Sequence, residues 1–304
     1  MEKVIVVIGP TSVGKTKMGV ALAKKFNGEV ISGDSMQIYK QMDIGTAKVT
    51  EEEKEGIIHH CVDILNPDET YSVHDFQQTV RKKITEITQR GHVPIIVGGT
   101  GLYIKAALYD YQFDEMENDH HAINEKYKDY TNEQLHDHLK SIDEESAKIL
   151  HFNNRRRVLR AIEIYETTGK RKSEMLEEQE HICLYDAYFV GLTLPRDVLY
   201  ERINKRVDVM MENGLKEEME RLYSQGLTRN HQSMKAIGYK EWFDYYDHQI
   251  DLNDVLELIK KHSRQYAKRQ YTWFKNQFDV HWYDVNLENF EQTIEQVTDD
   301  IEKS

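Results

Sequence analysis

The sequence predicts an α/β protein: a P-loop-containing parallel sheet flanked by helices, with a helical insertion domain. Three observations support this fold class. A glycine-rich loop follows a short apolar run near the start of the chain, apolar and helix-forming segments alternate in both end regions, and strand-like segments are missing between about residues 110 and 186. With 304 residues, 39% of them hydrophobic, the chain can bury a large core.

The glycine-rich loop spans residues 9–16 and reads Gly-Pro-Thr-Ser-Val-Gly-Lys-Thr, a full match to the phosphate-loop pattern. The run before it predicts a strand over Val4–Ile8, and the residues after it predict a helix over Lys15–Phe26. In that order the backbone N–H groups point at a diphosphate, Lys15 adds a cation, and the Thr16 hydroxyl can bind Mg²⁺. We therefore expect a diphosphate to bind Gly9, Pro10, Thr11, Ser12, Val13, Gly14, Lys15 and Thr16.

The sequence lacks a clear Walker-B strand, the apolar run ending in Asp that holds the metal in ATPases and GTPases. Val93–Val97 continues into Gly98-Gly99-Thr100-Gly101 without an acid, and the apolar run before Asp63 is too short. This weakens a motor or switch function. It favours a transferase that uses the diphosphate as a handle or as a leaving group.

The order of the elements predicts a parallel sheet covered by helices, because strands and helices alternate. Strands are expected at Val4–Ile8, Gly28–Ser32, His60–Ile64, Val93–Val97, Tyr188–Leu194 and Val280–Tyr283. Helices are expected at Lys15–Phe26, Val73–Arg90, Gly101–Leu108, Arg196–Asn213 and Leu252–Asn276. Residues 1–109 and 187–304 then form the P-loop core with its C-terminal helices, and residues 110–186 form the insertion domain.

Three segments should meet at the carboxyl edge of this sheet, where ligands of open parallel sheets bind. They are the P-loop, the segment 32–39 after the second strand and the segment 98–103 after the fourth. Asp34 is thereby expected near the diphosphate. An Asp after a strand is as often a helix cap or a turn residue, so a catalytic and a structural role both stay open.

The net charge of −13 is unevenly distributed along the chain. Residues 110–152 hold 12 Asp and Glu against 4 Lys, whereas residues 154–172 and 260–278 are basic. Because local charge decides what a surface attracts, the acidic total does not exclude a polyanionic partner.

Cysteine content and hydropathy indicate the compartment. Two cysteines allow neither a disulfide framework nor a structural zinc site, and no apolar stretch reaches membrane length. The apolar run near the N-terminus is too short for a signal peptide. We expect a cytoplasmic protein without a membrane partner.

Further motifs follow the P-loop in a fixed order. They are Ile-Ser-Gly-Asp-Ser-Met-Gln-Ile-Tyr-Lys at 31–40, Met-Asp-Ile-Gly-Thr-Ala-Lys at 42–48, Tyr-Ser-Val-His-Asp-Phe at 71–76, Val-Gly-Gly-Thr-Gly-Leu-Tyr at 97–103, Arg-Arg-Val-Leu-Arg-Ala at 156–161, Lys-Ala-Ile-Gly-Tyr-Lys at 235–240 and Ala-Lys-Arg-Gln-Tyr-Thr-Trp at 267–273. Together they resemble the bacterial tRNA dimethylallyltransferases, also called tRNA isopentenyltransferases. The resemblance covers essentially the whole chain except the acidic part of the insertion.

The resemblance implies a reaction. The dimethylallyl group of dimethylallyl diphosphate moves to N6 of adenosine 37 in tRNAs that read codons beginning with U, and pyrophosphate is released. Asp34 would accept the N6 proton, Thr100 would orient the base or the acid, and Arg221 would add a cation. Mg²⁺, with Thr16 and Lys15, would stabilise the departing diphosphate.

The resemblance also implies contacts with the tRNA anticodon stem-loop. No obligate protein partner is evident from the sequence, and we expect a monomer. The expected tRNA-binding residues are Asp34, Ser35, Met36, Gln37, Arg156, Arg157, Val158, Leu159, Arg160, Lys235, Ala236, Ile237, Gly238, Tyr239 and Lys240. The insertion departs from this pattern where it is strongly acidic, at Asp114 to Asp119, and no tRNA contact is expected there.

Three other functions remain to be distinguished. A P-loop kinase of a small metabolite would have the same fold up to about residue 109, but it would turn over ATP. An enzyme that prenylates free AMP would not need the basic run at Arg155 to Arg160. A nonenzymatic RNA-binding protein would not need the diphosphate grip of Lys15 and Thr16.

Overall fold

The computed structural model describes residues 1–111, 120–177 and 181–304, which form two compact units. Met1–Tyr109 and Cys183–Ser304 make up the first unit, and Asp110–Ile182 make up the second. The chain re-enters the first unit at Cys183, which pairs with Tyr109 in a β-bridge. The acid-rich stretch at 114–119 lies outside the described residues.

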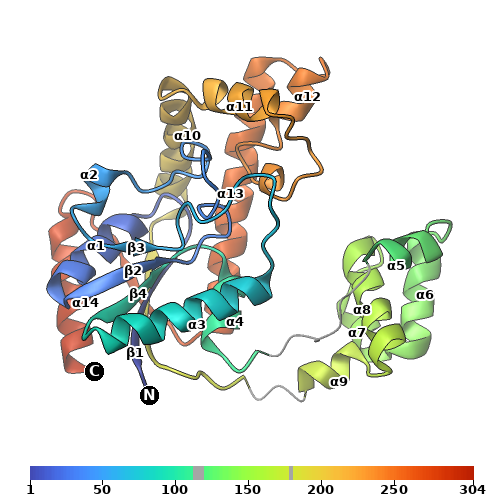
Figure 1. Cartoon of the computed structure of the whole chain (residues 1–304), viewed down its shortest axis with the longest axis horizontal. Helices are drawn as coiled ribbons and strands as arrows, with labels where there is room; N and C mark the ends of the chain where they lie inside the picture. Colours follow the sequence, from blue (N-terminus) through green and yellow to red (C-terminus); the bar gives the residue numbers. More distant parts are fainter. Residues whose placement is uncertain (112–119, 178–180) are drawn as a thin grey trace. The chain divides into compact units, whose positions relative to one another are not determined.

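A sheet of six parallel strands forms the centre of the first unit (Figure 1). Its order is β3-β2-β4-β1-β5-β6, which confirms the expected fold class. The strands are β1 (Lys3–Ile8), β2 (Gly28–Ser32), β3 (His59–His60), β4 (Val93–Val97), β5 (Asp186–Thr193) and β6 (His281–Asp284). All carboxyl ends therefore lie at one edge, and the segments that follow β1, β2 and β4 meet there.

The third strand is shorter than expected, and the prediction of a strand over His60–Ile64 was wrong. Cys61 and Asp63 have φ angles of 61° and 54°, which no extended strand can include. The carboxylate of Asp63 accepts a hydrogen bond from Lys48 Nζ at 2.5 Å. Asp63, the acid of the weak Walker-B match, is thus held in an ion pair with Lys48.

Helices cover both faces of the sheet (Figure 1). The helices of the first unit are α1 (Lys15–Lys25), α2 (Glu51–Lys54), α3 (Val73–Gln89), α4 (Gly101–Leu108), α10 (Arg196–Glu212), α11 (Leu215–Ser224), α12 (Trp242–Tyr246), α13 (Leu252–Gln277) and α14 (Phe290–Lys303), with a 3₁₀ turn η1 (Ser233–Lys235). Of these, α11 and α12 lie beyond the sheet, beside α10 and α13. Within the described part of the chain, none of the helices has the length and apolar character needed to cross a bilayer.

Strand β1 is buried on both faces, which explains its continuous apolar sequence. Val4, Val6 and Ile8 join one hydrophobic cluster with helix α3, and Ile5 and Val7 join another with helix α1. The P-loop therefore follows a strand that is buried on both faces.

The second unit is helical, with its own hydrophobic core. Its helices are α5 (His120–Lys126), α6 (Asn132–Ile142), α7 (Glu144–Ile149), α8 (Arg155–Thr168) and α9 (Lys172–Glu177). Leu135 and Leu139 of α6 pack against Val158 and Ile162 of α8.

The close packing of α1 on β4 predicts the effect of Gly19→Ala. Alanine favours a helix over glycine by about 1 kcal/mol, but a Cβ at Gly19 would lie 2.4 Å from Val97 Cγ2. Overpacking of this kind costs about 1–3 kcal/mol, so we expect a net loss of about 1 kcal/mol in the free energy of unfolding. Urea unfolding of Gly19→Ala, with Gly19→Ala/Val97→Ala as the relieved control, measures it; a stabilised single variant would contradict the close contact.

Candidate functional site

The P-loop backbone contains positive φ angles, two of them at glycines. Gly9 and Gly14 have φ angles of 147° and 104°, and Ser12 at the apex has a φ of 67°. A Cβ at Gly9 would lie 2.5 Å from the carbonyl oxygen of Leu192 in β5, so no other residue fits there. The loop ends where α1 begins, at Lys15, whose Nζ donates to Pro10 O at 2.8 Å.

Side chains from distant parts of the chain hold the P-loop in place. Gln270 of α13, only 5% exposed, accepts from Thr11 N at 2.9 Å and donates to Gly99 O at 3.0 Å. Arg202 of α10 donates from Nε to Ser12 O at 3.0 Å. Gln270 thus joins the P-loop directly to the segment after β4. Neither Gln270, which stands in the motif at 267–273, nor Arg202 was predicted from the sequence to belong to the site.

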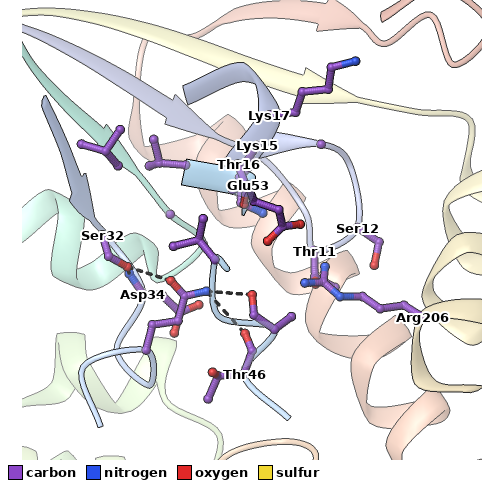
Figure 2. A pocket seen from close by; sticks show the side chains of 18 of the residues that line it. Thr11, Ser12, Lys15, Thr16, Lys17, Ser32, Asp34, Thr46, Glu53 and Arg206 are labelled. Carbon is purple, nitrogen blue, oxygen red and sulfur yellow. Dashed lines mark hydrogen bonds between the residues drawn. The ribbon is translucent and has the colours of Figure 1, made fainter. Parts of the chain in front are cut away.

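A first cavity of about 570 Å³ opens beside the P-loop (Figure 2). It is lined by Lys15 and Thr16, by Asp34, by Glu53 of α2, and by the cations of α10. Those cations are Arg202, Lys205 and Arg206. One wall is therefore strongly positive.

Electrostatics suit the first cavity to an anion. Burial, and after it the charge of Arg206, lowers the pKa of Lys15 from 10.5 to about 7, while Asp34 acts in the opposite direction. Burial also lowers the pKa of Arg206, although Glu53 and Asp34 favour its charged form. Since desolvation and like-charge repulsion both disfavour these cations, a bound diphosphate would relieve both effects.

Asp34 has a turn role and also lines the cavity. Met36 N donates to its Oδ1 at 2.8 Å, the local hydrogen bond expected of a structural Asp. Asp34 nevertheless lines the first cavity and also a second one. Both roles that the sequence left open are compatible with this geometry.

Thr100 is hydrogen-bonded to the turn that contains Asp34 and is not among the residues that line the two cavities. Its Oγ1 accepts from Ser35 N at 3.1 Å and lies 3.3 Å from Ser35 Oγ, and its own N–H donates to Gly33 O at 3.2 Å. Tyr266 of α13 donates to Gly99 O at 3.3 Å. Burial first, and then Asp34, raises the pKa of Tyr266 to about 12, so its hydroxyl stays protonated.

The second cavity, of about 330 Å³, adjoins the first. Both are lined by Thr11, Ser12, Asp34, Thr46, Ala47 and Arg206. The second also receives Ser35 and Met36, Tyr266, and the segment after η1. Asp34 and Arg206 therefore lie where a ligand in one cavity would meet a ligand in the other.

Two predicted site residues are held by hydrogen bonds to other parts of the protein. Arg221 of α11 lines neither cavity, and its Nη2 donates to Gln41 O at 3.3 Å. Arg206 of α10, one helix earlier, lines both cavities. Gln37 lines the first cavity, but its amide bridges Ser32 Oγ to the carbonyl oxygens at 46 and 47 (Figure 2).

The segment 235–240 is divided between cavity and core. Lys235, Ala236, Ile237, Gly238 and Lys240 line the second cavity. The Tyr239 side chain is fully buried, and its hydroxyl donates to Glu218 Oε1 at 2.6 Å. A ligand in the cavity can reach the two lysines but not the tyrosine ring.

The basic segment of the second unit is divided in the same way. Val158 and Leu159 pack in the core of that unit, whereas Arg156 and Arg157 are exposed. Arg160 pairs with Glu163 at 2.8 Å. Only the arginines of this segment of α8 can contact a partner.

Known proteins match the chain over most of its length. The family model of IPP transferases matches residues 37–277. A tRNA dimethylallyltransferase of Bacillus cereus is 55% identical over 287 residues, which cover 93% of this chain and 90% of that protein. The chain belongs to the tRNA dimethylallyltransferase family.

Solved structures agree with this assignment. A tRNA Δ2-isopentenylpyrophosphate transferase from Staphylococcus epidermidis has 47% identity and a TM-score of 0.75, over 100% of this chain and 99% of that one. A eukaryotic dimethylallyltransferase acting on tRNA has 33% identity and a TM-score of 0.86, over 98% of this chain and 78% of that one. The P-loop and Asp34 precede the family-model match at 37–277, but they lie within the match to the Staphylococcus epidermidis structure. Membership of the tRNA dimethylallyltransferases favours a prenyltransferase over the kinase and nonenzymatic alternatives.

The lowered pKa of Lys15 predicts how anion binding depends on pH. A bound diphosphate favours charged Lys15, so binding takes up a proton once the pH exceeds the free pKa of about 7. We expect the dissociation constant of pyrophosphate to rise above pH 7, by up to about tenfold per unit. Titration calorimetry from pH 6.5 to 9 tests this. Lys15→Arg, which stays charged, is the control for ionisation of the ligand itself; identical pH slopes for both proteins would refute the prediction.

Proposed function

We propose that this protein transfers the dimethylallyl group of dimethylallyl diphosphate to N6 of adenosine 37, in tRNAs that read codons beginning with U, and releases pyrophosphate. Family membership supports the transfer of a dimethylallyl group to tRNA. The observation that carries the proposal further is the junction of two cavities at Asp34 and Arg206. One cavity suits a diphosphate, and the other adjoins it and is lined in part by Lys235 and Lys240.

The diphosphate is proposed to bind in the first cavity as the leaving group. The N–H groups of the P-loop, Lys15 and Arg206 would surround its oxygens. As the C1–O bond breaks, its electron pair passes to pyrophosphate, and these groups stabilise the developing charge. They act most strongly in the transition state, because the charge on the departing oxygen is greatest there.

Magnesium fits the lining of the first cavity. The Thr16 hydroxyl and the carboxylates of Asp34 and Glu53 are oxygen ligands of the kind Mg²⁺ prefers, and Mg²⁺ is typically held by one or two protein groups together with substrate phosphates. When bound, the ion would neutralise charge on the diphosphate. Thr16 is the residue proposed to hold it.

Asp34 is proposed to accept the proton. The lone pair of N6 forms the new bond to C1, and the N6 proton passes to the carboxylate of Asp34. The hydrogen bond that Met36 N donates to Asp34 Oδ1 fixes the orientation of that carboxylate. Thr100 is proposed to act through the same turn, because it holds Ser35 next to Asp34.

The adenine must leave its stack to reach the second cavity, since N6 is not accessible in a stacked loop. Lys235 and Lys240 at that cavity, and Arg156 and Arg157 of the second unit, are proposed to bind tRNA phosphates. Phosphate contacts of this kind fix position without reading sequence.

One assay tests the proposal against its alternatives. The protein is incubated with Mg²⁺, dimethylallyl diphosphate and unmodified tRNA that has adenosines at positions 36, 37 and 38, and the digested nucleosides are analysed by mass spectrometry. We expect one dimethylallyl group on adenosine 37 and one released pyrophosphate. In parallel reactions, AMP in place of tRNA should give no prenylated nucleotide, and ATP in place of dimethylallyl diphosphate should give no phosphorylated product. Transfer to AMP but not to tRNA, or phosphoryl transfer from ATP, would refute the proposal.

Asp34→Asn separates the catalytic role of Asp34 from its turn role. Asparagine can still accept the bond from Met36 N, but it cannot accept a proton. We expect the single-turnover rate to fall by about 10²- to 10⁴-fold, with substrate affinities and melting temperature near those of the wild type. A near-normal rate at saturating substrates would show that Asp34 is only structural.

Arg156→Ala/Arg157→Ala tests the proposed tRNA contacts of α8. Both side chains are exposed, so their loss should leave the fold intact. Each lost phosphate contact should reduce the slope of log affinity against log salt by about one unit. Filter binding of tRNA at several salt concentrations measures the slope, with Lys148→Ala of α7 as the control. Equal slopes for the wild type and the arginine variant would exclude phosphate contact by these residues.

A further inference from the structure

The carboxylate of Glu218 is buried and binds four donors. Glu218 lies on α11 and is only 2% exposed. Its Oε2 accepts from Asp43 N and Ile44 N, both at 2.9 Å, and its Oε1 accepts from Gly45 N at 3.0 Å. The hydroxyl of Tyr239 donates to the same Oε1 at 2.6 Å. Successive N–H groups that converge on one anion form a strong local anion site.

This carboxylate joins two segments that both line the second cavity. The loop 43–47 contributes Gly45, Thr46 and Ala47 to its lining, and the segment 235–240 contributes five residues around buried Tyr239. The two segments also touch directly, because a Cβ at Gly45 would lie 2.5 Å from the Tyr239 ring. Through its two oxygens Glu218 therefore fixes the spacing of two cavity walls.

The P-loop is held by other residues. Gln270 binds Thr11 and Gly99, and Arg202 binds Ser12, so the grip on the diphosphate does not depend on α11. The loop 43–47 also reaches the first cavity through Thr46 and Ala47, but the groups proposed to bind the diphosphate come from the P-loop and α10. A change at Glu218 should therefore alter the second cavity most and change diphosphate affinity little.

We propose that Glu218 is a positioning residue that sets the width of the second cavity, and thereby the approach of the acceptor base to the reacting carbon. The proposal rests on the proposed function, in which the second cavity receives the adenine. Glutamine at this position keeps the shape, but its NH₂ group would face N–H donors that now contact a carboxylate oxygen. Buried N–H groups without an acceptor are costly, so the loop should shift.

Single-turnover kinetics of Glu218→Gln test the proposal. We expect the rate to fall by about 10- to 100-fold at saturating substrates, as for a displacement of about 1 Å at a reacting centre. The KM for tRNA should rise, whereas the affinity for dimethylallyl diphosphate should stay within about twofold of the wild-type value. Glu217→Gln, an exposed neighbour on α11, is the matched control and should behave as the wild type.

Two milder variants keep the test valid if Glu218→Gln fails to fold. Tyr239→Phe removes one of the four donors, and Gly45→Ala pushes the two walls apart. Both should show the same pattern, a lower rate and a higher KM for tRNA with unchanged diphosphate affinity. A loss of diphosphate affinity in parallel with the rate would indicate general damage and overturn the proposal, as would wild-type rates in the folded variants.

Hydrogen exchange provides a readout independent of catalysis. The amides of Asp43, Ile44 and Gly45 should exchange slowly in the wild type and at least about tenfold faster in Glu218→Gln or Tyr239→Phe. Unchanged protection would overturn the proposal. If the wild type itself transfers no dimethylallyl group to tRNA, the proposed function fails, and the exchange data still decide whether Glu218 holds the loop.

Discussion

The burial of like charges at the carboxyl edge of the sheet is the constraint on which the site depends. Lys15 and Arg206 line one cavity, and burial lowers the pKa of each. Their desolvation and mutual repulsion disfavour the charged forms, and one dianionic ligand offsets both. Such an arrangement persists only if the backbone cannot relax. The hydrogen bonds of Gln270 and Arg202 to the P-loop supply that rigidity.

Sequence patterns could predict those parts of the site that follow strands directly. The P-loop, Asp34 and Thr100 were placed together because the carboxyl ends of parallel strands share an edge. Gln270 lies 259 residues from its partner Thr11, and nothing local distinguishes it from other polar residues on an amphipathic helix. The same limit applies to Arg206 of α10, which lines the cavity but was not predicted, whereas Arg221 of α11, expected from the family resemblance, lines neither cavity.

Most of the fold was predictable because local pattern and tertiary burial agree. β2 and β4 have the expected bounds, and the insertion is helical as expected. The prediction of the third strand over His60–Ile64 was wrong because of contacts with a segment distant in the sequence. Asp63 N donates to Gln37 O and Ile64 N donates to Ile38 O, so the segment after His60 pairs with the chain beyond β2 rather than with β2 itself. The left-handed backbone conformations of Cys61 and Asp63 let the segment turn away from β2 and pair with residues 37 and 38. A pattern of apolar residues cannot reveal such a turn.

The charge distribution reconciles an acidic chain with a polyanionic substrate. A net charge of −13 repels nucleic acid in general, so unspecific association with phosphates is weak. Cations are nevertheless concentrated locally, at the lining of the two cavities and on the exposed face of α8. In the proposed function, tRNA phosphates would therefore be bound by these local cations despite the acidic total, and the buried pair Lys15 and Arg206 would bind the diphosphate.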